Sequence, residues 1–137
     1  MITEDYVSFE TAKLLKEKGF GIEEETRGYY PIKGDATGRL MFGAEYHHNT
    51  SQVQIAAPTL QMAMKWLREK HKLYIGINIE VGDIQMLPSY DFEETVLGYN
   101  FVIYNEETLI WVFKDKTPRS YEKAVEAAIK YCLENLI

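Results

Sequence analysis

The chain has 137 residues, of which 46% are hydrophobic and 26% charged, and this balance excludes an intrinsically disordered protein. Its length suits a single domain with one hydrophobic core. A net charge of −6 argues against a surface built as a whole to follow a phosphate backbone, although a local basic patch is compatible with it.

Cysteine usage and hydropathy indicate the compartment. Cys132 is the only cysteine, so no intrachain disulfide can form, and we expect a reducing environment. Residues 1–10 are acidic and lack the apolar segment of a signal peptide. No apolar run approaches the ~20 residues of a membrane span. We therefore expect a cytoplasmic protein without a membrane partner.

Tyrosine is unusually frequent, with 10 copies. Because tyrosine has an apolar body and a polar tip, this excess indicates partly wet strand faces or contact surfaces.

The first predicted helix covers residues 9–18. Ser8 provides its N-cap, Phe9, Ala12 and Leu15 recur on one face, and Gly19 ends it where a left-handed residue is favoured. The acidic run at residues 23–25 is interpreted as a solvated edge.

A hairpin is predicted next, from strands at residues 29–33 and 39–46 around a turn at 34–38. Leu40, Phe42, Ala44 and Tyr46 alternate onto one face of the second strand. Residues 47–54 are polar and are interpreted as a loop.

The central stretch, residues 55–81, combines an amphipathic helix and a half-buried strand. Pro58 suits the first helical turn, and Thr59 is an alternative cap. Helical spacing continues to His71, after which residues 73–81 alternate strictly between apolar and other side chains. The apolar helix stripe comprises Leu60, Ala63, Met64, Leu67 and His71.

The last third begins with a long connection at residues 82–95, which is functional or a tether for its own apolar residues. Strands at 96–104 and 109–114 predict a second hairpin. After a charged linker, Ser120 caps a final helix that extends nearly to residue 137 and buries a stripe containing Cys132.

The predicted fold is therefore one α+β domain, residues 1–137, in the order α-ββ-α-β-ββ-α. A mainly antiparallel sheet of about five strands packs against three helices.

Three segments resemble a group of small proteins encoded by bacteriophages and mobile elements of Bacteroides-like gut bacteria. They are YVSFETAK with KGF at residues 6–13 and 18–20, APT with KWLREKH at 57–59 and 65–71, and SYEKA at 120–124. The resemblance covers the two ends and the centre of the chain and implies a mobile-element context. It implies no catalytic residue, because no activity is established for the group.

The sequence predicts no catalytic constellation, metal or cofactor. Glu45, His47 and His48 form the one cluster of metal-ligand types, but neighbouring histidines on a strand point to opposite faces, and a third ligand would have to be His71 or a distant carboxylate. Cys132 lies on an apolar helix stripe, where cysteine behaves as a small hydrophobe. No GxSxG motif is present, and residues 34–38 lack the ending of a phosphate loop.

The basic cluster at residues 65–72 is the clearest candidate for an interaction surface. Lys65, Arg68, Lys70 and Lys72 outweigh Glu69, which gives a local charge of +3. Trp66 lies among them, and this combination is typical of phosphate contacts with base stacking. The favoured interpretation of the same residues is the solvated face of an amphipathic helix, whose long aliphatic stems cover apolar surface. A positive face for an acidic protein partner or a second copy is as compatible with them as phosphate contacts are.

These observations favour a non-enzymatic accessory or protein-interaction protein, with self-association as a homodimer also open. One alternative is a nucleic-acid-binding regulator that uses residues 65–72, and another is an acidic inhibitor that mimics nucleic acid. The candidate contact residues come from the central helix and from the 82–95 connection. They are Lys65, Trp66, Arg68, Lys72, Met86, Leu87, Tyr90 and Phe92.

Overall fold

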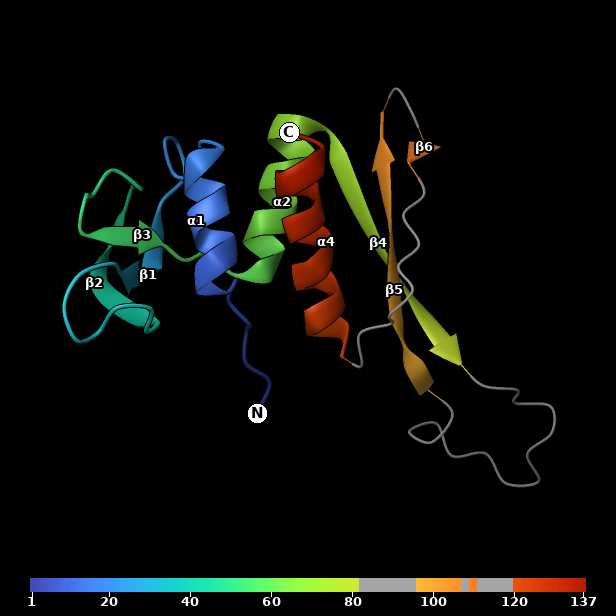
Figure 1. Ribbon diagram of the computed structural model, residues 1–137, viewed down its shortest axis with the longest axis horizontal. Coiled ribbons are helices and arrows are strands. Elements are labelled where there is room, and N and C mark those ends of the chain that lie inside the picture. The colour runs from blue at the N-terminus through green and yellow to red at the C-terminus, as the bar shows by residue number, and fades with distance from the viewer. Residues whose placement is uncertain (82–95, 107–108, 111–119) are drawn as a thin grey trace.

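The computed structural model describes residues 1–81, 96–106, 109–110 and 120–137. Its helices form a layer between two small antiparallel sheets (Figure 1). The elements are α1 (Phe9–Glu17), β1 (Thr26–Pro31), β2 (Met41–His47), β3 (Gln54–Ala56), α2 (Leu60–His71), β4 (Leu73–Val81), β5 (Val96–Asn105), β6 (Leu109–Ile110) and α4 (Tyr121–Asn135). The predicted α+β class and the order of its elements are confirmed. No helix in the described ranges is long and apolar enough to cross a membrane.

Polar caps define where the helices begin. The Ser8 hydroxyl accepts the Thr11 N–H, and the Ser120 hydroxyl accepts the Lys123 N–H. Gly19, with a φ of 96°, follows the end of α1 as its sequence predicts. At α2 the alternative cap is the correct one, because the Thr59 hydroxyl accepts the Met62 N–H while Pro58 precedes the helix.

The first sheet has the strand order β2-β1-β3. β3 lies where the predicted loop at 47–54 meets the central stretch, a place where no strand was predicted, and it pairs with β1 from Tyr29↔Ala56 to Pro31↔Gln54. This strand is too short to produce a recognisable alternation. The β1–β2 ladder is irregular, because Thr26 pairs with His47 and Gly28 with Phe42, so residues 43–46 lie opposite Arg27 alone.

The second sheet has the order β4-β5-β6, so the strands divide between two sheets and do not form one. Lys72 adopts a left-handed φ of 57° at the end of α2, and β4 starts at the next residue. The strand then pairs with β5 from Leu73↔Asn105 to Val81↔Val96, on the opposite side of the helices from β1 (Figure 1). Ile79 is exposed although the alternation places it on the core side, because the hairpin extends past the helical layer.

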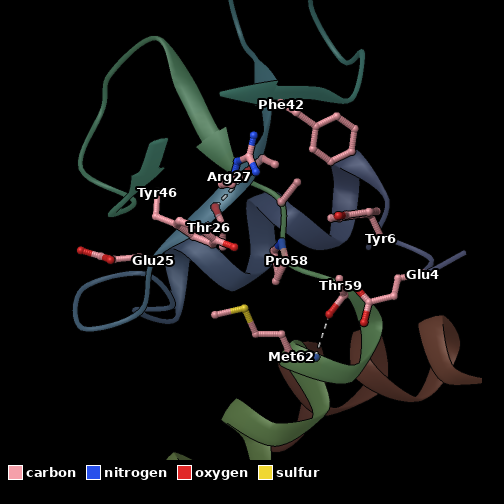
Figure 2. Close-up of a pocket in the computed structure, with 12 residues that line it drawn as sticks. Glu4, Tyr6, Glu25, Thr26, Arg27, Phe42, Tyr46, Pro58, Thr59 and Met62 are labelled. Carbon is pink, nitrogen blue, oxygen red and sulfur yellow. Dashed lines mark hydrogen bonds between the residues drawn. The ribbon is translucent and has the colours of Figure 1, made fainter. Parts of the chain in front are cut away.

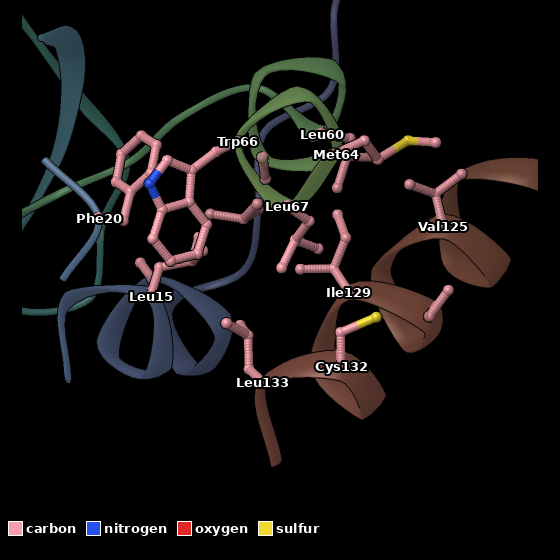
Figure 3. Close-up of a cluster of buried hydrophobic side chains, with 14 of the residues drawn as sticks. Leu15, Phe20, Leu60, Met64, Trp66, Leu67, Val125, Ile129, Cys132 and Leu133 are labelled. Atoms are coloured by element: carbon pink, nitrogen blue, oxygen red, sulfur yellow. The ribbon is translucent and has the colours of Figure 1, made fainter. Parts of the chain in front are cut away.

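The core lies where the three helices meet (Figure 3). Leu15 of α1, Leu67 of α2 and Ile129 of α4 are fully buried there. Phe20 packs edge-to-face on Trp66 with ring centroids 5.6 Å apart. The helices bury most of the residues in the stripes predicted from helical spacing, but His71 is only partly buried and α2 buries Trp66 in addition.

Candidate interaction groove

The basic face of α2 does not include Trp66, although the sequence places this residue among the cations. Trp66 is only 6% exposed, with its ring packed on Phe20 and on His71, so its prediction as a contact residue for a base or a partner is wrong. The reason is helical geometry: position 66 is three residues from the buried Ala63 and shares its side of the helix. Lys65 lies 3.9 Å from the Glu69 carboxylate.

The remaining cations of this face differ in their surroundings. Lys70 forms an ion pair with Glu23 of the acidic run, whereas Lys72 is exposed at the end of the helix and Arg68 is partly exposed. Arg68 and Lys72 therefore keep their positions as candidate contacts. Met86, Leu87, Tyr90 and Phe92 lie outside the described residues.

His48, one of the candidate metal ligands, contacts the acidic run at residues 23–25. The His48 Nε2 atom lies 3.2 Å from the Glu25 carboxylate, and its Nδ1 atom lies 3.0 Å from the Glu24 carbonyl oxygen. Within the described ranges, no three histidine, cysteine, aspartate or glutamate side chains come together as metal ligands. Cys132 is fully buried, and this burial raises the pKa of its thiol to about 12.

A groove of about 530 Å³ opens between the first sheet and the start of α2 (Figure 2). The N-terminal segment contributes Glu4 and Tyr6 to the lining, and β2 contributes Phe42 beside Tyr6 and Tyr46 on the other side of the groove (Figure 2). Met62 of α2 contributes to the lining. The volume is within the range of sites that bind small ligands or a few side chains of a partner.

Main-chain contacts join three of the segments that line the groove. Tyr6 forms a β-bridge with Thr59, which attaches the N-terminal segment to the start of α2. The Ala57 N–H donates to the Gly28 carbonyl at 2.9 Å. A Cβ atom at position 28 would lie 2.7 Å from the Ala57 carbonyl oxygen, so only glycine permits this approach.

Aromatic side chains line the groove and remain accessible. Phe42 and Tyr46 are 56% and 63% exposed, and Phe42 packs edge-to-face on Tyr6 with ring centroids 5.2 Å apart. The sequence placed Phe42 and Tyr46 on one strand face but did not identify them as a site. The excess of tyrosine was the available signal, since it predicted contact surfaces.

The Arg27 side chain is held between Tyr46 and Phe42. Its Nε–H donates to the Gly43 carbonyl at 3.1 Å, and its guanidinium carbon lies 5.9 Å from the centre of the Tyr46 ring. Figure 2 shows the guanidinium group between Tyr46 and Phe42. Among the residues that the structure describes, no carboxylate forms an ion pair with Arg27. The groove thus presents a positioned cation beside exposed aromatic rings.

Comparison with known proteins gives no relative. No family model matches the chain, and no curated protein or solved structure is detectably similar to it. The function of the groove therefore has to be argued from its own residues.

Proposed function

We propose that the chain is a non-enzymatic interaction protein of a phage or mobile element and that it binds a protein partner through the groove. The mobile-element context comes from the sequence resemblance alone. The observation that carries the proposal is the exposure of Phe42 and Tyr46 on either side of Arg27.

The composition of the groove supports a protein partner. Aromatic residues, methionine and arginine are enriched at protein interfaces, and truncations that cost the most binding energy are concentrated at tyrosine, tryptophan and arginine. Covering the exposed Phe42 ring removes apolar surface from water, and this contributes favourably to the free energy of binding. Main-chain contacts between the lining segments reduce the entropy that is lost on binding.

The topology of the first sheet also supports this function. β2 is an edge strand, and an exposed edge with large apolar side chains is a template for contact with another chain. The irregular pairing at residues 43–46 works against continuous strand addition. We therefore expect a partner to bind mainly through side chains in the groove.

Site-specific photocrosslinking in the native cytoplasm tests the proposal. A benzophenone amino acid replaces Phe42 in one variant and Tyr121 in the control, because Tyr121 is 42% exposed at the start of α4 and outside the groove. We expect a discrete protein adduct from position 42 that persists after nuclease treatment and is absent from position 121.

The other outcomes contradict the proposal in different ways. Equal labelling at both positions, or none at position 42, would show that the groove is not a specific contact surface. Adducts that disappear with nuclease would favour the nucleic-acid alternative. That alternative would then have to show a steep salt dependence and a loss of binding in Lys65→Glu and Arg68→Glu.

A further inference from the structure

We infer that the groove recognises an acidic peptide segment, with a carboxylate bound to Arg27 and a neighbouring apolar side chain packed on Phe42 and Tyr6. This inference rests on the proposed function and adds the chemistry of the partner. It follows from the donors that Arg27 leaves unused and from the aromatic surface beside them.

The orientation of Arg27 favours a carboxylate. Its Nε–H donates to the Gly43 carbonyl, and its guanidinium carbon lies over the Tyr46 ring. The two terminal nitrogens remain, and they donate in the planar fork that matches the two oxygens of a carboxylate. Because the side chain is already oriented, less rotamer entropy is lost when a ligand binds.

The acidic residues near the groove do not occupy this position. Glu25 lines the groove, but its carboxylate is 3.2 Å from the His48 imidazole. Glu4 also lines the groove, but it lies beside Thr59 and away from Arg27 (Figure 2). The groove is therefore polarised, with Arg27 favouring a carboxylate and Glu4 favouring an amide or amine of the same segment.

The start of α2 adds to the attraction for negative charge on the side of Met62. Thr59 and Met62 both line the groove, and the first turn of this 12-residue helix contains no acidic residue. The positive end of the helix dipole is thus not neutralised by the helix itself. This contribution supplements Arg27 and does not replace it.

Apolar contacts in the groove select the side chain next to the carboxylate. The Phe42 ring meets Tyr6 at an interplanar angle of 71°, which leaves an aromatic corner rather than a flat surface. Met62 adds a flexible apolar side chain that adapts to the shape of a ligand. A phenylalanine or leucine next to the acidic residue fits this surface.

Two blocked tetrapeptides test the inference, acetyl-Ala-Phe-Asp-Ala-amide and its Asn counterpart. Amide NMR spectra of the labelled protein, which include the Arg27 Nε–H signal, report the affinity and the location of binding. We expect the Asp peptide to bind about fivefold more tightly, the size of a partly exposed ion pair. We expect shifts at Arg27, Phe42 and Tyr46.

Matched charge variants give the control. Arg27→Gln should remove the preference for Asp, whereas Arg39→Gln should retain it, because Arg39 is an exposed cation that does not line the groove. Arg27 is itself exposed, so we expect both variants to fold, and their amide spectra check this directly.

The two proposals fail separately. Equal affinity for the Asp and Asn peptides, with shifts confined to the groove, would overturn the carboxylate chemistry and leave the groove as a contact surface. A preference for Asp that Arg27→Gln does not change, or shifts outside the groove, would also overturn the inference. The proposed function itself fails if crosslinking at Phe42 gives no protein adduct that is specific to that position and resistant to nuclease.

Discussion

The Glu126 carboxylate of α4 accepts a hydrogen bond from the Thr11 hydroxyl of α1 at 2.5 Å, although the two residues are 115 positions apart. The same carboxylate oxygen accepts the Ser8 N–H at 2.9 Å. One acidic side chain therefore satisfies a buried hydroxyl and an N–H at the start of α1, where a negative charge is also favoured by the helix dipole. This contact joins the first and last helices of the chain.

Removing the Glu126 carboxylate should destabilise the protein. Hydrogen bonds to a charged group are worth about 1.5–3 kcal/mol, so we expect Glu126→Ala to lower the free energy of unfolding by about 2 kcal/mol. Urea denaturation measures this change. Glu134→Ala is the control, because its exposed carboxylate lies 3.8 Å from Lys130 and we expect an effect within about 0.5 kcal/mol. Equal effects of the two substitutions would contradict the proposed tie.

His71 should make stability depend on pH. Its burial lowers its pKa below the ordinary 6.5, so the unfolded chain binds a proton at a higher pH than the folded protein does. The free energy of unfolding should therefore fall as pH decreases below about 6.5, and the fall should level off below the folded pKa. Denaturation at pH 7.5 and 5.0 measures it, and His71→Gln should show a smaller difference. A variant with an unchanged pH dependence would refute this assignment.

Cys132 should be unreactive in the folded protein. With its pKa raised to about 12, very little thiolate exists at pH 8, and the sulfur is also inaccessible. We expect a thiol reagent to react on the order of a hundredfold or more slowly with the native protein than with protein unfolded in urea. Similar rates in the two states would show that the end of α4 is open to solvent.

Gly28→Ala should destabilise the first sheet. The added Cβ would lie 2.7 Å from the Ala57 main-chain oxygen, and the N–H of the same residue donates to the Gly28 carbonyl, so the two segments are held close together. Overpacking of this kind costs about 1–3 kcal/mol. Gly76→Ala is the comparison, since its nearest contact is a Val102 methyl group at 3.1 Å, and we expect a smaller loss. Thermal unfolding distinguishes them, and a neutral Gly28→Ala would argue against the close approach.

The sequence predicted the helices better than it predicted the sheets. Ser8, Thr59 and Ser120 act through local hydrogen bonds, so their positions are readable from neighbouring residues. The division into two sheets depends on the left-handed Lys72 and on which side of the helices β4 lies. Neither is encoded in the alternation of residues 73–81, which is the same for either arrangement.

The candidate site was harder to predict for a related reason. Trp66 is next to lysines in the sequence, but helical rotation places it against Phe20 and not beside them. Phe42 and Tyr46 have the spacing of core residues, but they are exposed because β2 is left uncovered along nearly its whole length on both faces. The groove also needs the N-terminal segment, which a β-bridge at Thr59 holds in place and which no local pattern predicts.

In the part of the chain that the structure describes, the two sheets share no ladder. Helix α2 spans the distance between them, with its first turn in the groove and its last residue close to the start of β4. Substitutions that reshape one sheet therefore do not alter the hydrogen-bond register of the other. Evolution can diversify the groove surface while the β4–β5 hairpin is conserved, or the reverse, provided that the three helices keep their packing. A protein engineer has the same freedom to graft a new binding surface onto β2 without redesigning the rest of the domain.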